Sequence, residues 1–124
     1  MDIYECGEKL KALRIGDMVA KIPIIQGGMG VGISRSKLAG AVAAEGGIGI
    51  ISTAQIGYDE DDFEKDQAGC NLLAIRKHIK RAKEIACGNG LVGVNIMVMK
   101  RLCDAYLNFS EERSRILLQL QSQL

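Results

Sequence analysis

Glycines gather at the ends of short apolar runs, and this arrangement constrains the fold more than any other feature of the sequence. The chain has 15 glycines in 124 residues. Residues 22–26 (IPIIQ) run into residues 27–32 (GGMGVG), and residues 48–52 (IGIIS) directly follow Gly46 and Gly47. Apolar runs of this length are typical of parallel strands that are buried on both faces. A glycine after such a strand permits positive φ and lets a ligand approach the main chain.

Helical patterns separate these apolar runs. Apolar residues recur at helical spacing in residues 37–45 and in residues 71–86, so we expect a helix in each segment. Ser34 is predicted to cap the first helix, because its hydroxyl can accept a backbone N–H of the first turn. A third apolar run, residues 91–97 (LVGVNIM), follows the second helix. The order β-α-β-α-β predicts parallel strands joined by right-handed crossovers.

The two ends of the chain depart from this alternation. Gly16 and Asp17 lie between short apolar runs in residues 10–21, which predicts a lead-in hairpin that covers the bottom of a barrel. Residues 100–124 contain neither glycine nor proline. Cap-like residues at 110–113 (SEER) are compatible with a helix there, and no further strand is evident.

Composition and charge exclude several classes of partner. The formal net charge of +1 gives no electrostatic reason to expect a nucleic acid or an anionic membrane as partner. No apolar stretch approaches the ~20 residues of a membrane span. The four cysteines match no zinc-site spacing, so free thiols in a reducing cytosol are expected. The acidic run at residues 59–62 lacks EF-hand spacing and is expected to be solvated. We therefore expect a cytoplasmic protein without a metal site.

Three segments mark the carboxyl ends of the predicted strands, where parallel α/β folds bind their ligands. They are the glycines after Gln26, the pair Ser52 and Thr53, and Asn95. The glycines approach the dinucleotide pattern GxGxxG, but its sixth position is Ile33, and no acidic residue follows the second strand. A nicotinamide site is therefore disfavoured. The glycines alone leave a turn that serves only tight geometry as the favoured alternative.

Taken together, the segments PIIQGGMGVGIS, LAGAVAAEGGIGIIS and VGVNIMV resemble the nitronate monooxygenase family and the related FMN-dependent enoyl-acyl-carrier-protein reductases. The resemblance implies the N-terminal portion of a (β/α)8 TIM barrel, truncated after about three β/α units, because a whole barrel needs ~250 residues. Residues 1–99 would form this portion. Residues 100–124 would be a divergent tail, for which we expect a frameshift or a truncation.

The resemblance also implies FMN as cofactor and an alkyl nitronate as substrate, which is oxidised with O2. The residues implied to lie along the flavin ring are Gln26, Gly27, Gly28, Met29 and Gly30. Asn95 is implied to hydrogen-bond the flavin, since an amide both donates and accepts. No catalytic residue is carried over, because the family's histidine lies in a later motif. His78 is expected to be a solvated residue on the second helix.

Other functions stay open on the sequence alone. The enzyme alternative is an enoyl-acyl-carrier-protein reductase, which requires a nicotinamide electron donor. A non-catalytic half-barrel that needs a complementary chain is an alternative of another class. An ordinary doubly wound binding domain is disfavoured by the missing acidic residue. We expect the chain alone to be inactive, to bind FMN weakly or not at all, and to self-associate through exposed barrel edges.

Overall fold

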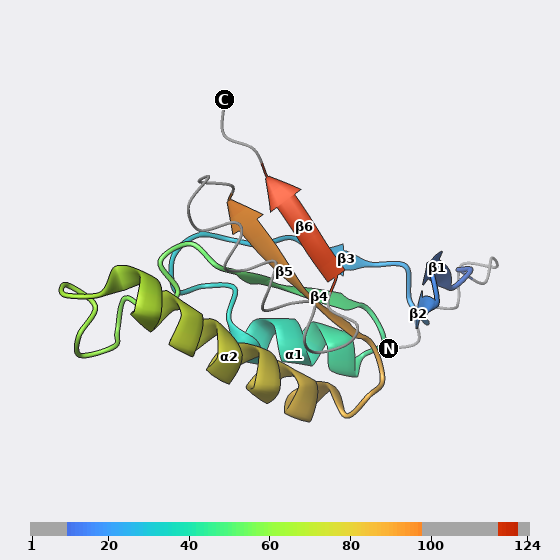
Figure 1. Ribbon diagram of the computed structural model, residues 1–124. Helices are drawn as coiled ribbons and strands as arrows, with labels where there is room; N and C mark the ends of the chain where they lie inside the picture. The colour runs from blue at the N-terminus through green and yellow to red at the C-terminus, as the bar shows by residue number, and fades with distance from the viewer. Residues whose placement is uncertain (1–9, 98–116, 122–124) are drawn as a thin grey trace.

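Two helices cover one face of a four-stranded parallel sheet in the computed structural model, which describes residues 10–97 and 117–121 (Figure 1). The sheet has the order β3-β4-β5-β6, and β1 and β2 form a separate antiparallel pair. The elements are β1 Leu13–Ile15, β2 Met18–Ala20, β3 Ile25–Gln26, α1 Ser36–Ala44, β4 Ile48–Ser52, α2 Gln67–Ala86, β5 Leu91–Met97 and β6 Leu117–Gln121.

The predicted β-α-β-α-β order is confirmed, and β4 and β5 have the expected bounds. β3, β4 and β5 are parallel neighbours, as crossovers through α1 and α2 require. The described residues form a small α/β fold with an open sheet and no closed barrel. Neither helix in the described part of the chain has the length and hydropathy of a membrane span.

β3 is shorter than predicted, because the chain makes a tight turn where the strand was expected to begin. The amide of Ile24 donates to the carbonyl of Ile22 at 2.8 Å, and Pro23 between them has no amide to donate. Regular pairing starts only when the carbonyl of Ile24 accepts from Ile48 at 2.8 Å. The strand therefore covers Ile25–Gln26 instead of residues 22–26.

The predicted cap of the first helix is wrong. α1 begins at Ser36, its N-cap is Arg35, and no side chain caps it. Ser34 lies one position too early because its buried hydroxyl closes the preceding loop instead. α2 begins four residues earlier than predicted, because Asp66 caps it by accepting from the amide of Gly69 at 2.9 Å.

The prediction that the C-terminal segment holds no further strand is also wrong. β6 pairs in parallel with β5 over five residues, from the Gly93–Leu117 pair to the Met97–Gln121 pair. The alternation of leucine and glutamine in residues 118–121 is a strand pattern. The cap-like residues 110–113, where a helix was considered, lie outside the described residues.

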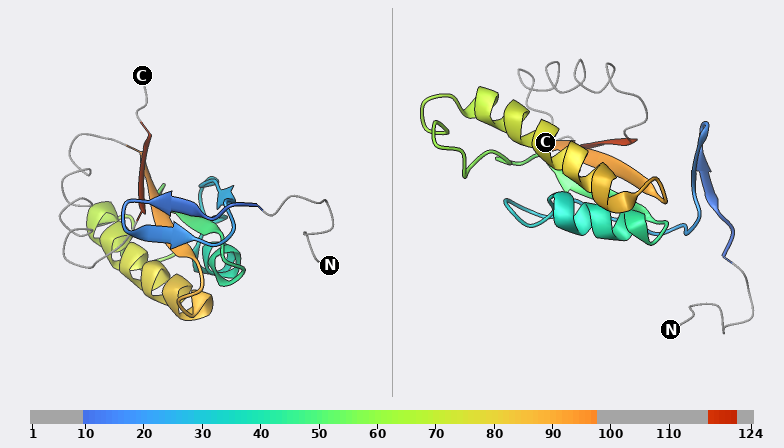
Figure 2. Two further views of the ribbon diagram at one scale, coloured as in Figure 1. Left: turned by 90° about the vertical axis from the view of Figure 1, so that its right-hand side faces the viewer. Right: turned by 90° about the horizontal axis from the view of Figure 1, so that it is seen from below.

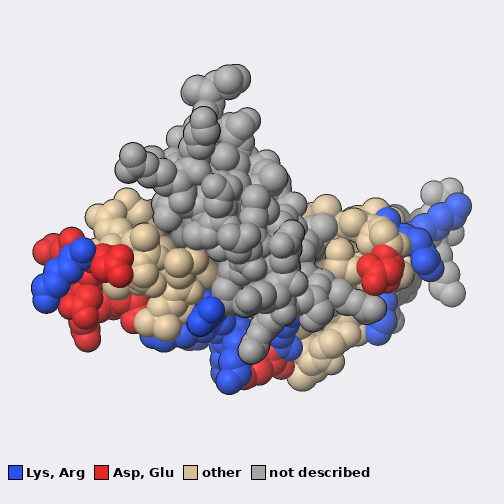
Figure 3. Space-filling model, in the orientation of Figure 1, with Lys and Arg blue, Asp and Glu red and all other residues tan. Residues whose placement is uncertain are grey.

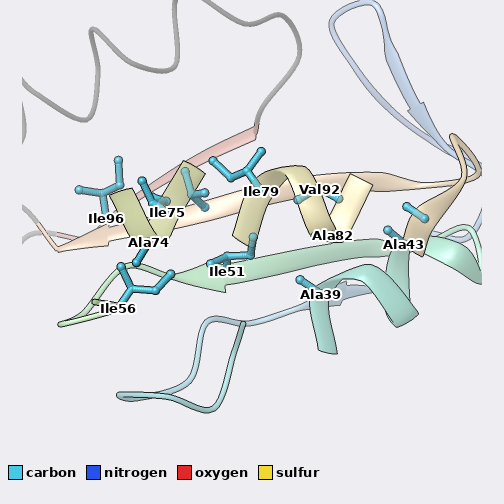
Figure 4. Packing of buried hydrophobic residues seen from close by; sticks show 12 residues of the cluster. Ala39, Ala43, Ile51, Ile56, Ala74, Ile75, Ile79, Ala82, Val92 and Ile96 are labelled. Carbon is cyan, nitrogen blue, oxygen red and sulfur yellow. The ribbon is translucent and has the colours of Figure 1, made fainter. Parts of the chain in front are cut away.

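Small residues let the helices lie close to the sheet and to each other. Figure 4 shows the main core, in which alanines of α1 and α2 face isoleucines and valines of the strands. A Cβ atom at Gly49 would lie 1.9 Å from the carbonyl oxygen of Ala39, and one at Gly40 would lie 2.8 Å from Cβ of Ile85. Glycine is therefore required at both helix contacts.

The lead-in hairpin is confirmed, and it packs at the end of the sheet where β4 and β5 begin. Leu13 and Ile15 pack with Ala20 against Ile48 and Leu91, which begin β4 and β5. The views in Figure 2 show the hairpin beside the end of the sheet where these strands start. The hairpin thus leaves the carboxyl ends of the strands, where ligands bind in such folds, to the loops.

Replacing Gly49 by alanine should destabilise the protein strongly, because the new methyl group overlaps the main chain of α1. We expect a loss of at least ~1–3 kcal/mol in the free energy of unfolding, the usual cost of overpacking. Gly27→Ala is the matched control, since a Cβ atom there meets nothing within 4 Å and φ is not positive. Chemical denaturation followed by circular dichroism measures both variants. Equal stability of the two would contradict the close helix contact.

Candidate functional site

The loop after β3 reaches across the end of β4 to a side chain on β5. Asn95 lies opposite Ser52 in the register of β4 and β5 and is 8% exposed. A Cβ atom at Gly28 would lie 2.9 Å from both Cβ and Nδ2 of Asn95. Only glycine allows this approach, so the main chain of Gly28 lies directly against the Asn95 carboxamide. The structure thereby brings together two of the residues predicted to contact a cofactor.

Asn95 is fixed from behind by Thr53 at the end of β4. The amide and the hydroxyl of Thr53 donate to the carbonyl oxygen of Asn95 at 3.1 and 2.9 Å. Val94 and Ile96 belong to the core under the helices, so the side chain of Asn95 points to the opposite face of the sheet. This face, at the carboxyl end of the strands, is where a parallel α/β sheet presents ligand-binding groups.

The carboxamide of Gln26 extends the pairing of β3 by one residue. Its Oε1 accepts from the amide of Ile50 at 3.1 Å, and its Nε2 lies 3.3 Å from the carbonyl oxygen of Ile50. Nε2 also donates to Ser34 Oγ at 3.1 Å and to the carbonyl of Gly27. Both ends of the amide thus serve the fold, and Gln26 contributes to the site by placing the loop.

Ser34 closes residues 27–34, hereafter the glycine loop, at its base. Its Oγ accepts from the amide of Met29 at 2.8 Å, and its own amide donates to the Met29 carbonyl at 3.3 Å. Ser34 is only 1% exposed. The sequence predicted a helix cap here, and no pattern in it distinguishes that use of a serine hydroxyl from loop closure. Two hydrogen bonds between Met29 and Ser34 therefore close the loop on itself.

The outer side of the glycine loop presents main chain and apolar side chains. A Cβ atom at Gly27 would meet nothing within 4 Å, and one at Gly30 would meet only Ile33 at 4.0 Å. Met29 is about half exposed. A planar group can approach main chain that carries so few side-chain atoms. The loop therefore presents open main chain beside the Asn95 carboxamide, which can both donate and accept hydrogen bonds.

An ion pair joins Arg35 to the loop between β4 and α2. Its guanidinium binds both carboxylate oxygens of Asp59, at 2.8 and 2.9 Å. These charge-assisted hydrogen bonds raise the pKa of Arg35 and lower the pKa of Asp59. The neighbouring acids are also paired: Glu60 with Lys77 at 2.7 Å, and Asp62 with Lys65 at 3.3 Å.

Figure 3 shows acidic and basic side chains together at the end of the molecule where the loop before α2 lies. In residues 10–97 and 117–121 no group of three or more histidine, cysteine or acidic side chains could hold a metal ion. Within the same residues Cys70 and Cys87 are both free thiols, as predicted.

His78 is not the solvated residue that the sequence suggested. It is half-buried, and its Nδ1 lies 3.0 Å from Oγ of Ser36 at the start of α1. Burial and the neighbouring charge of Arg35 lower the pKa of His78. It lies in the helix layer, on the face of the sheet opposite to the Asn95 side chain. His78 therefore joins α2 to α1, and the sheet separates it from the candidate site at the strand ends.

The described residues form a parallel α/β sheet with a glycine loop and a buried amide at the carboxyl ends of its strands, the position at which folds of this class bind ligands. The sequence model of the nitronate monooxygenase family matches residues 12–113, and the chain belongs to this family. The resemblance inferred from the three glycine-rich motifs is thus confirmed. The family is one of oxidoreductases that are generally flavin-dependent. A comparison with curated proteins gives no significant match.

Acid should destabilise the protein through His78, the only histidine in the chain. Its pKa in the folded state lies below the ordinary value of 6.5, so the unfolded chain takes up the proton first. The free energy of unfolding should therefore fall as pH falls from 7 to 5. The slope should flatten in His78→Gln, measured by urea denaturation across this range. An identical slope in the variant would show that His78 is not the group responsible.

Proposed function

We propose that this chain forms the ring-facing wall of the FMN site in a nitronate monooxygenase. The contact between the main chain of Gly28 and the buried carboxamide of Asn95 carries the proposal. It joins the ends of β3 and β5 at the edge of the sheet where α/β proteins bind ligands. Membership of the nitronate monooxygenase family supports the reaction class.

The residues present suit distinct parts of this task. Gly27 and Gly28 offer main chain that a planar ring can approach, Met29 and Gly30 complete the proposed wall, and Gln26 places the loop that carries it. The carboxamide of Asn95 has both a donor and an acceptor, which flavin ring nitrogens and carbonyls require. Bound there, FMN would supply the oxidation of an alkyl nitronate, and O2 would reoxidise it. The protein would orient the substrate and exclude water from the ring.

We further propose that the described sheet is the N-terminal portion of a (β/α)8 barrel. Its strands run parallel in sequential order from β3 to β5, and β3 and β4 are each followed by a helix, as barrel strands are. The FMN phosphate contacts and a catalytic histidine would then come from later parts of the barrel. This assignment makes the chain inactive when it is alone.

An enoyl-acyl-carrier-protein reductase is the second candidate, because the same three motifs resemble that group. The two reactions differ in their electron donor. A nitronate monooxygenase consumes O2 with an alkyl nitronate and no nicotinamide, whereas the reductase oxidises NAD(P)H with an enoyl thioester. Assays of the full protein in which this chain occurs, with either substrate pair, separate the candidates. Turnover of the enoyl thioester alone would overturn the monooxygenase assignment.

Asn95→Asp should weaken FMN binding, because the carboxylate keeps the size of the amide but loses its donor. We expect at least about a tenfold rise in Kd, the effect of ~1.4 kcal/mol. Titration of FMN fluorescence with the full protein measures it.

The control is Asn89→Asp at the other end of the sheet, where Nδ2 of Asn89 donates to the carbonyl of Ala44. This variant also loses a structural hydrogen bond but should keep its FMN affinity. Equal weakening in the two variants would mean that stability, and not flavin contact, is being measured.

We also propose that the chain pairs with a second copy of itself along β3. Ile25 on this edge strand and Ile24 just before it are each 51% exposed. No charged residue occurs between Lys21 and Arg35, so two copies meet without like-charge repulsion. Light scattering should show a dimer that Ile25→Lys dissociates, while Leu73→Lys, at an equally exposed leucine on α2, leaves it intact. If the unsubstituted chain is a monomer, this pairing is wrong.

A further inference from the structure

One arginine ties the glycine loop to the loop between β4 and α2, residues 53–66. Arg35 directly follows the glycine loop, and its side chain is 18% exposed. Besides its paired hydrogen bonds to Asp59, its NH2 donates to the carbonyl oxygen of Ile56 at 2.9 Å. Three hydrogen bonds from one planar group fix both the distance and the orientation between the two loops.

An aromatic ring completes the connection on the side of the glycine loop. The guanidinium carbon of Arg35 lies 4.7 Å from the ring centroid of Tyr58, which allows a cation–π contact. The same ring lies against Gly32, where a Cβ atom would be 3.0 Å from the Tyr58 hydroxyl. Gly32 has φ of +77°, a conformation that suits glycine. Tyr58 therefore contacts the tip of the glycine loop while Arg35 holds its end.

The residues that Arg35 grips are themselves anchored in the helix layer. Ile56 is 1% exposed and belongs to the main core. The amide of Gly57 donates to the buried Oδ1 of Asn71 on α2 at 2.9 Å. In contrast, Val31 and Ile33 at the tip of the glycine loop are about half exposed or more. The tip makes little contact with the core, so its position depends on its base and on Arg35.

We propose that Arg35 is a positioning residue, which sets the glycine loop against Asn95 by clasping it to residues 56–59. Arg35 acts through the loop and touches no ligand itself. The consequence for flavin binding rests on the proposed function, whereas the order that its contacts with residues 56–59 give the loop does not. Lysine cannot replace it, because an ammonium group cannot bind both Asp59 oxygens and the Ile56 carbonyl while it stacks on Tyr58.

Hydrogen exchange directly tests whether the contacts of Arg35 with residues 56–59, hereafter the clasp, hold the glycine loop, because two amides report on the base of this loop. These are the amides of Met29 and Ser34, whose hydrogen bonds close the loop. In Arg35→Met we expect both to exchange about tenfold faster, while amides in the middle of α2 keep their rates. Arg35→Lys should behave like Arg35→Met, because the planar guanidinium group with its several donors is required and the positive charge alone is not sufficient. Asp59→Asn should give a smaller effect in the same two amides.

The matched control is Arg81→Met, which removes an arginine from an exposed ion pair with Glu84 on α2. It should leave the Met29 and Ser34 amides unchanged. Faster exchange at amides in every part of the Arg35→Met variant would indicate general destabilisation and would overturn the positioning role. Unchanged exchange at the Met29 and Ser34 amides would overturn it as well. Full rescue by Arg35→Lys would also overturn it.

A second readout separates this role from the proposed function. In the full protein, Arg35→Met should weaken FMN binding, and Arg81→Met should not. If the exchange results hold but the parent protein binds no FMN, the flavin assignment fails and the clasp stands. If the parent binds FMN and Arg35→Met binds it equally well despite a loosened loop, the positioning role is wrong.

Discussion

The main chain of Gly28 lies on the side chain of Asn95, and the arrangement of the strand ends depends on this contact. It spans β4, because Gly28 follows β3 while Asn95 belongs to β5. A side chain at position 28 would hold the two apart. Around it, Gln26 and Ser34 fix the glycine loop from within, and Thr53 fixes the carbonyl of Asn95 from below. Hydrogen bonds within the chain thus hold both partners of the contact in place.

The sequence predicted most of the layered fold, and its errors have local causes. β4 and β5 are nearly continuous apolar runs, as strands buried on both faces are, and a glycine directly precedes each of them. β3 was overestimated because the hydrogen bond across Pro23 depends on local chain geometry. α2 was underestimated because its first turn contains Gly69, a poor helix former, and only the cap at Asp66 marks its start. β6 was missed because its evidence is a long-range pairing with β5.

The candidate site could be predicted only in part. Parallel strands place their carboxyl ends at one edge, so the proximity of the glycine loop to Asn95 followed from the order of the elements. The use of the Gln26 carboxamide as an extra rung of the sheet did not follow, because the same side chain could face a ligand. The contacts of Arg35 depend on how two irregular loops fold against each other. Neither local propensity nor periodicity contains that information.

Flavin placement at the Gly28–Asn95 contact is the central claim, and the side-chain amide of Asn95 reports on it most directly. Its ¹⁵N–¹H resonances in the full protein can be followed by NMR as FMN is added, with the backbone amides of Gly27 and Gly28 alongside. With FMN bound at this contact, we expect these three sets of signals to shift together and to saturate with FMN. FMN binding that leaves all three in place while signals elsewhere move would contradict it.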